Sequence, residues 1–208
     1  MHSTKLPIAV GAVFALLIAC SPTKPAPSHG PATPSGATLI PGGPMEPTPV
    51  VPSPKIPASQ QEAQDTVLRY LQQTVNGLPK GSSLDGSRYV VGGDTQYCED
   101  EPSGPNAPVR FSDWRDIKTP PGIDFNALVA QVGDLWKSWG WQVIERNGYD
   151  KPNRFGYAPD GYVLQITASY PPTYPPSIIG ASPCYPGNLR RNDIQRNPPV
   201  ITQTQSSG

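Results

Sequence analysis

The chain reads IDFNALVAQVGDLWKSWGW from Ile123 to Trp141, and this stretch contains the best determined element of the predicted fold. Its apolar residues recur at spacings of three and four, the period of one face of an α-helix. Asp124 is placed to cap the first backbone N–H groups, and Gly140 to end the helix. The stretch therefore predicts an amphipathic helix, followed by a strand over residues 141–146. The expected apolar stripe consists of Phe125, Leu128, Val132, Leu135 and Trp139, with Val129 and Trp136 widening it and Ile123 and Leu128 forming a hydrophobic staple.

A second helix is predicted earlier in the chain, over residues 60–76. Ser59-Gln60-Gln61-Glu62 has the form of a capping box, in which the serine and glutamate side chains each satisfy a free backbone N–H. Asn76-Gly77 is expected to supply a left-handed stop, and Pro79 prevents the helix from continuing. The apolar face consists of Ala63, Val67, Leu71 and Val75.

Short runs of strand-forming residues lie on both sides of the helix that Asp124 caps. We expect strands at 88–91, 95–98 and 109–114 before it, and at 141–146, 154–157 and 162–170 after it. A last edge strand is expected to begin at 178–179. In the run 162–170, expected to be the longest strand, Tyr162, Leu164 and Ile166 alternate toward one face. One apolar sheet face and two amphipathic helices predict an α+β fold, a two-layer sandwich in which both helices cover one face of an antiparallel sheet.

The N-terminus reads as a lipoprotein signal peptide over residues 1–19. Lys5 precedes a short apolar run, and Leu17-Ile18-Ala19-Cys20 has the order of a bacterial lipobox. We therefore expect lipidation of Cys20, whose thiolate is nucleophilic enough to be alkylated. Two or more acyl chains would hold the protein stably on the membrane. An ordinary secretory signal containing a cysteine is the alternative reading.

The composition divides the remainder of the chain. Twelve of the 29 prolines lie between Ser21 and Ser59, which predicts a disordered, proline-rich stalk over residues 20–58. A glycosylated stalk and a proline-motif ligand are alternative readings of this segment. We expect the globular domain at 59–187 and a loose polar tail at 188–208.

Charge and residue content exclude several kinds of function. Sixteen basic residues balance sixteen acidic ones, which gives no electrostatic case for nucleic-acid binding. The only histidines are His2 and His29, so the predicted domain has none for Ser-His-Asp or Cys-His catalysis or for zinc ligation. We predict no cofactor. In an exported chain the two remaining cysteines, Cys98 and Cys184, are expected to form a disulfide.

Two groups of acidic residues are candidate sites. Glu99-Asp100-Glu101 offers oxygen ligands for calcium, but it lacks the spacing of a calcium loop and favours a solvated turn. Asp113 and Asp116 are candidates for a glycosidase-like carboxylate pair, against the simpler reading of ordinary loop acids.

Two groups of aromatic residues are candidate binding surfaces. Trp136, Trp139 and Trp141 are candidates for a sugar platform, although Trp139 continues the helix stripe and so favours the core, leaving Trp136 or Trp141 to be exposed. The run 170–176, YPPTYPP, is a candidate polyproline segment, against the simpler reading of a stiff loop.

Several short motifs together resemble the LppA-like small lipoproteins of mycobacteria, and in the predicted domain the resemblance covers residues 60–184. They are the lipobox, the proline-rich stalk, Leu78-Pro79-Lys80-Gly81, a cysteine after the first strand, Trp139-Gly140-Trp141, Asp160-Gly161-Tyr162 and Ser182-Pro183-Cys184. The proline-rich insertion near Pro171 departs from that pattern. The resemblance implies a surface lipoprotein with no catalytic residues to carry over.

The sequence as a whole predicts a non-enzymatic, lipid-anchored protein of the cell membrane that faces the extracytoplasmic side. Its expected partners are the membrane, the enzymes that process lipoproteins, and an envelope protein or glycan. A carrier of a lipid or small amphiphile is the main alternative, and a carboxylate-based envelope hydrolase is a further one.

Overall fold

The computed structural model describes residues 47–204 of the 208-residue chain. The predicted signal peptide, Cys20 and most of the predicted stalk lie outside these residues. Neither α-helix within 47–204 has the length and apolar character needed to cross a membrane.

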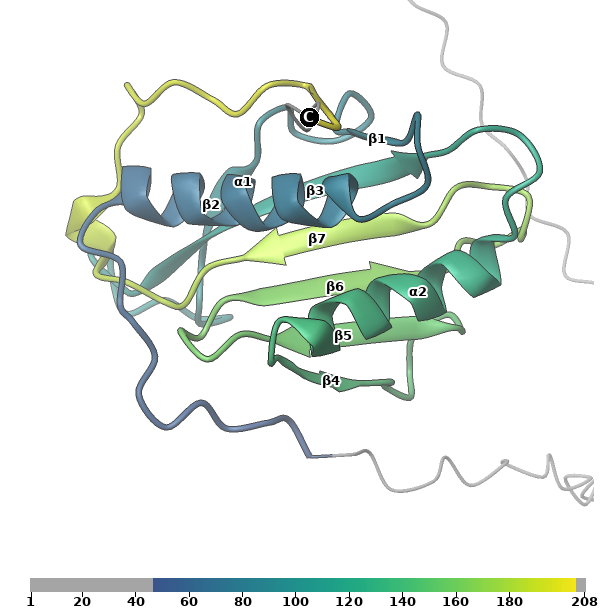
Figure 1. Cartoon of the computed structure of the whole chain (residues 1–208). Coiled ribbons are helices and arrows are strands. Elements are labelled where there is room, and N and C mark those ends of the chain that lie inside the picture. The colour runs from purple at the N-terminus through teal and green to yellow at the C-terminus, as the bar shows by residue number, and fades with distance from the viewer. Residues whose placement is uncertain (1–46, 205–208) are drawn as a thin grey trace, which may run out of the picture. The chain divides into compact units, whose positions relative to one another are not determined.

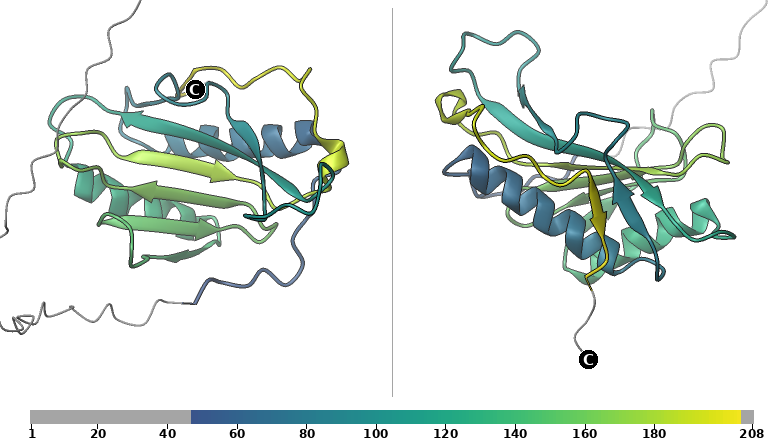
Figure 2. Two further views of the ribbon diagram at one scale, coloured as in Figure 1. Left: turned by 180° about the vertical axis from the view of Figure 1, so that it is seen from behind. Right: turned by 90° about the horizontal axis from the view of Figure 1, so that it is seen from above.

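Two helices pack against one face of a single eight-stranded antiparallel sheet (Figure 1), which confirms the predicted α+β fold. The sheet order is β4-β5-β6-β7-β3-β1-β8, with β2 pairing separately with β3. Seen from behind (Figure 2, left), the sheet lies in front of both helices, so no helix within residues 47–204 covers its other face. The elements in chain order are α1 (Gln60–Asn76), β1 (Ser83–Asp85), β2 (Asp94–Tyr97), β3 (Val109–Lys118), α2 (Phe125–Ser138), β4 (Gln142–Ile144), β5 (Asn153–Tyr157), β6 (Val163–Thr167), β7 (Ser177–Ala181), the 3₁₀ turn η1 (Gly187–Leu189) and β8 (Val200–Thr202).

The N-terminal caps of both helices form as the sequence predicts, whereas Gly77, predicted as a left-handed stop for α1, has a right-handed backbone with φ -87°. The Ser59 hydroxyl accepts a hydrogen bond from the Glu62 backbone N–H at 3.1 Å, and α1 spans the predicted residues. The Asp124 carboxylate accepts bonds from the N–H groups of Asn126 and Ala127 at 2.8 and 3.2 Å. These local bonds satisfy donors that the first turn of a helix leaves free.

The buried face of α2 differs from the predicted stripe. Its buried residues are Leu128, Val129, Val132, Gly133 and Trp136, while Leu135 and Trp139 are only half-buried. The reason is that α2 packs across β5, which centres the contact on Val129, Val132 and Trp136. At Gly133 an added Cβ would lie 2.7 Å from Cγ of Arg154, so the missing side chain lets the Arg154 stem pass.

Several strand predictions are corrected by the pairing. The run 88–91 is a turn rather than a strand, with Tyr89 N–H donating to Gly86 and Gly93 N–H donating to Val90. The longest strand is β3, not the run 162–170, which is extended in the sheet only over β6. The expected edge strand at 178–179 is β7, which lies inside the sheet between β6 and β3.

The C-terminal segment was predicted to be a loose tail, and this was wrong over residues 188–204. It runs along the domain and ends in β8, which pairs with β1. Its polar groups bond inward: Asn197 Nδ2 donates to Asp113 at 3.0 Å, and the Gln203 amide donates to the carbonyls of Val75, Leu78 and Pro79. Polar composition therefore reflects buried hydrogen bonding here rather than disorder.

The end of the predicted stalk also contacts the domain. Lys55 N–H donates to the Asp160 carbonyl at 2.9 Å, and Pro57 is buried. A Cβ at Gly161 would lie 2.6 Å from Pro54, which shows how closely this segment approaches the β5–β6 turn. The ordered structure therefore begins before residue 59.

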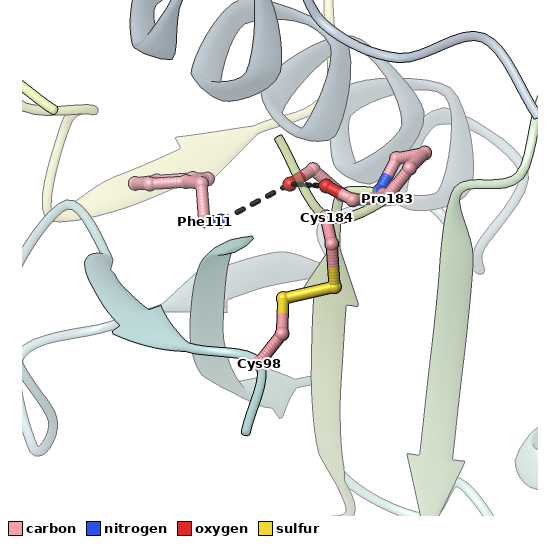
Figure 3. Close-up of a disulfide and its surroundings, with 5 residues drawn as sticks. Cys98, Phe111, Pro183 and Cys184 are labelled. Atoms are coloured by element: carbon pink, nitrogen blue, oxygen red, sulfur yellow. Dashed lines mark hydrogen bonds between the residues drawn. A yellow bond between two sulfur atoms is a disulfide. The ribbon is translucent and has the colours of Figure 1, made fainter. Parts of the chain in front are cut away.

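The predicted disulfide between Cys98 and Cys184 is confirmed, with their Cα atoms 6.3 Å apart (Figure 3). Both cysteines flank the start of β3, because Cys98 N–H donates to the Pro108 carbonyl and Tyr185 pairs with Val109. Phe111 N–H also donates to the Ser182 hydroxyl at 3.0 Å, which holds the chain beside Cys184 against β3.

Candidate functional site

The two acids proposed as a carboxylate pair, Asp113 and Asp116, lie on opposite faces of β3. Asp113 is fully buried on the helix side, where Arg115 donates to both of its oxygens at 3.0 and 2.8 Å. Asp116 lies on the uncovered face and accepts bonds from Arg88 and Tyr89 at 2.6 and 2.9 Å. The pair therefore cannot act together on one glycosidic bond, since both carboxyl groups would have to flank it.

The other polar candidates are surface segments. Glu99, Asp100 and Glu101 are exposed in the β2–β3 loop. Across residues 47–204, no cluster of three or more His, Cys, Asp or Glu side chains is arranged to hold a metal ion. The run 170–176 is the β6–β7 loop, in which Ser169 Oγ donates to the Pro175 carbonyl and Tyr170 is 84% exposed.

The three tryptophans divide differently from the expectation. Trp136 is fully buried and its indole N–H donates to Thr74 Oγ1 at 3.1 Å, so it belongs to the core. Trp141 is 7% exposed, and Trp139, which was expected in the core, is half-buried at the surface. The cause is the early end of α2 at Ser138: Trp139 is the C-cap residue, and Gly140 follows at φ +81°.

The left-handed turn at Gly140 brings Trp139 and Trp141 together beside α1. Their ring centroids are 5.4 Å apart in an edge-to-face arrangement, and Tyr70 meets Trp141 edge-to-face at 4.8 Å. The three rings line a surface hollow of about 610 Å³, here called the aromatic hollow. Its lining residues are Arg69, Tyr70, Gln73 and Asn76 from α1, Trp139 and Trp141 after α2, and Pro159 and Asp160 from the β5–β6 turn.

Hydrogen bonding and charge fix the rings of the aromatic hollow. The Tyr70 hydroxyl donates to Asp160 Oδ2 at 2.6 Å, and the Arg69 guanidinium lies 4.3 Å from the Tyr70 ring centroid. Burial, followed by the hydrogen bond to Asp160, raises the pKa of Tyr70 to about 12. Tyr70 therefore keeps its proton at neutral pH and acts as a fixed donor rather than as a base.

Gln73 is the free polar group of the aromatic hollow. Its side chain is exposed on α1 one turn after Tyr70, and its amide has no hydrogen-bond partner among residues 47–204. Asn76, by contrast, is already occupied by Gln72 and Thr204. Gln73 thus leaves one donor and one acceptor group available to a ligand.

A second exposed surface is the face of the sheet opposite the helices. Trp114 is 45% exposed there and contacts Tyr89, with ring centroids 5.9 Å apart. A cross-strand row of Ile179, Gln165 and Phe155 continues from Trp114 across β7, β6 and β5. Hollows of about 450 and 470 Å³ adjoin Trp114, and their lining mixes apolar residues with arginines.

The contact between helices and sheet is filled by side chains. A Cβ at Gly180 would lie 2.7 Å from Val67, and a Cβ at Gly156 would lie 2.7 Å from Trp136. Contacts this short leave no space for a methyl group. An acyl chain has no room between the layers at these positions, which weighs against the carrier alternative.

The sequence predicts two of the three rings of the aromatic hollow. Trp139 and Trp141 were candidates, but Tyr70, Gln73 and Asp160 were not connected with them. The available signals were the Trp139-Gly140-Trp141 turn and the Asp160-Gly161 turn, but nothing in the sequence shows that both approach the same side of α1.

The fold and the hollow together define a disulfide-linked α+β domain with a preformed aromatic surface site. Comparison of the chain with protein-family models, with curated proteins and with solved structures found no match.

Proposed function

We propose that this protein is a lipid-anchored lipoprotein of the extracytoplasmic side of the cell membrane that binds a ligand without transforming it. The observation that carries the proposal is the aromatic hollow, which is open at the surface and presents three rings beside the Gln73 amide. Concave sites lined by aromatic residues with a few polar groups are typical of ligand binding.

The groups around the aromatic hollow support binding rather than catalysis. General acid–base catalysis works best with a group whose pKa lies near the operating pH. Tyr70 has a pKa of about 12, and its hydroxyl is engaged with Asp160. Within the lining Asp160 is the only carboxylate, so the paired acids of a glycosidase have no counterpart in it.

The anchor rests on the lipobox at residues 17–20, outside the described residues. Lipid attachment at Cys20 would place the binding domain at the membrane surface, and the proline-rich residues after it would act as a spacer. The partners implied are the membrane itself and the enzymes that attach the lipid and remove the signal peptide. The resemblance to LppA-like lipoproteins agrees with this placement.

The test of the anchor is Cys20→Ala in the expressing bacterium, followed by membrane fractionation and mass spectrometry. Loss of the only thiol that the lipobox offers should prevent acylation, so the variant should leave the membrane fraction or retain its signal peptide. Trp139→Ala is the control, because it keeps the lipobox and should fractionate with membranes. A soluble wild-type protein with an unmodified Cys20 would contradict the proposal.

A further inference from the structure

We infer that the aromatic hollow is a carbohydrate-binding subsite that takes a neutral sugar residue of an envelope glycan. This inference rests on the proposed function and names the ligand class of its site. Trp139 would stack on the sugar ring, and Gln73, Arg69 and Asp160 would bond its hydroxyl groups.

The rings form a platform with one accessible member. Trp141 is nearly buried and is held edge-on by both Tyr70 and Trp139. Tyr70 is covered on its ring by Arg69, whereas Trp139 remains partly exposed and lines the hollow. A pyranose presents an apolar face of C–H groups, and the partly positive hydrogens of these groups are attracted to the negative face of an indole ring.

The polar groups of the hollow match a ring of hydroxyls. Each sugar hydroxyl both donates and accepts, and Gln73 offers an unpaired amide with both functions. Arg69 adds donors, and the Asp160 carboxylate retains acceptor capacity beyond its bonds with the Tyr70 hydroxyl and the Tyr162 N–H. Planar side chains of this kind can bond two neighbouring hydroxyls at once.

Charge favours a neutral ligand over an ionic one. Arg69 and Asp160 contribute one positive and one negative charge, and they are the only ionised side chains in the lining. The two charges cancel, so the lining offers no net electrostatic attraction to a ligand of either sign. A purely apolar ligand would strip water from Gln73, Arg69 and Asp160 without replacing their hydrogen bonds, which is costly.

The site is rigid before the ligand arrives. Tyr70 is fixed by its hydrogen bond to Asp160 and by ring contacts with Trp141 and Tyr162. Trp139 and Trp141 are set by the turn at Gly140. A preorganised platform loses little conformational entropy on binding, which suits a ligand that offers few apolar contacts.

The experiment measures binding by the purified full-length lipoprotein in detergent. The probes are neutral oligosaccharides of glucose, mannose, galactose, arabinose and N-acetylglucosamine, followed by saturation-transfer NMR and tryptophan fluorescence. The variants are Trp139→Ala, Trp139→Phe and Gln73→Ala. The matched control is Trp114→Ala, which removes an exposed tryptophan on the opposite face of the sheet.

We expect at least one probe to bind the wild-type protein. Trp139→Ala should weaken that binding about tenfold, the loss of one ring contact of about 1.4 kcal/mol. Trp139→Phe should restore part of it, Gln73→Ala should weaken it severalfold, and Trp114→Ala should leave it unchanged.

The inference is overturned if the folded wild-type protein binds none of the probes at millimolar concentration, or if Trp139→Ala binds as tightly as the wild type. Chromatography of the recovered probe separates this inference from the proposed function. A probe that binds through Trp139 and is cleaved would support the site and overturn the non-enzymatic function. If no probe binds but Cys20 is acylated, the carbohydrate-binding inference fails and the proposed lipid anchor stands.

Discussion

Asp113 and Arg115 form an ion pair whose side chains are completely excluded from solvent. They are two residues apart on β3, so they point to the same face of the sheet. The ion pair makes two further hydrogen bonds. Asn197 Nδ2 donates to the Asp113 carboxylate, and the Pro199 carbonyl accepts from the Arg115 guanidinium. The pair therefore fastens the C-terminal segment to the middle of the sheet rather than serving a reaction.

Asp113→Ala should destabilise the domain by about 3–5 kcal/mol, because it leaves the Arg115 charge buried without its partner. Denaturant unfolding followed by tryptophan fluorescence measures this change. The control is Asp134→Ala, whose ion pair with Lys137 is solvent-exposed and should contribute nothing measurable. A loss of stability in Asp113→Ala no larger than that of the control would contradict the buried pair.

The raised pKa of Tyr70 predicts that the stability of the domain depends on pH in the alkaline range. Its pKa is about 12 in the folded domain against a usual value of 10.0. Between these values the unfolded chain has released the proton that the folded domain keeps, so the free energy of unfolding must fall as pH rises from about 10 to 12. Tyr70→Phe should show a shallower fall in denaturant unfolding across this range. An identical pH dependence in the variant and the wild type would contradict the assignment.

At the scale of elements, the helices could be predicted because their signals are local. Ser59 and Asp124 cap backbone groups within three residues, and the apolar period repeats over several turns. The strands β1 and β8 could not be predicted, since each has three residues and forms only by pairing with a distant partner. Residues 88–91 have strand-forming side chains, but they lie in the connection between β1 and β2, which pair with the two ends of β3.

The close contact between the layers gives a prediction for Gly180 on β7. A Cβ there would lie 2.7 Å from Val67 and 3.2 Å from Leu164. Gly180→Ala should therefore force α1 away from the sheet and cost about 1–3 kcal/mol. Gly104→Ala is the matched control, because a Cβ at Gly104 meets no atom within 4 Å. Thermal unfolding compares the two, and equal melting temperatures would contradict the tight packing described here.

For the whole molecule, the two-layer architecture could be predicted from the sequence, but the residues at which the folded domain begins and ends could not. Alternation and helical period indicate two layers, whereas the segments 47–58 and 188–204 are rich in proline and polar residues that also suit disorder. These segments are held on the domain by individual long-range hydrogen bonds, such as those from Lys55 to Asp160 and from Asn197 to Asp113. The aromatic hollow has the same character, because Tyr70, Trp139 and Asp160 come from three separate parts of the chain.

The disulfide acts on the whole domain, because Cys98 and Cys184 are 86 residues apart and enclose β3, α2 and β4–β7. Closing so long a loop removes entropy from the unfolded chain, which a loop-closure estimate puts at about 4–5 kcal/mol. A typical domain has a stability of about 5–15 kcal/mol, so the bond represents a large share of it.

Cys98→Ser should therefore melt well below the wild type. The double variant Cys98→Ser/Cys184→Ser should melt at a similar temperature to the single variant, and so should the reduced wild-type protein, because all three lack the same bond. Thiol labelling after denaturation without reductant provides the direct test. The role of the bond would be contradicted if Cys98 and Cys184 were both labelled in the oxidised protein. Equal melting temperatures of the reduced and oxidised proteins would contradict it as well.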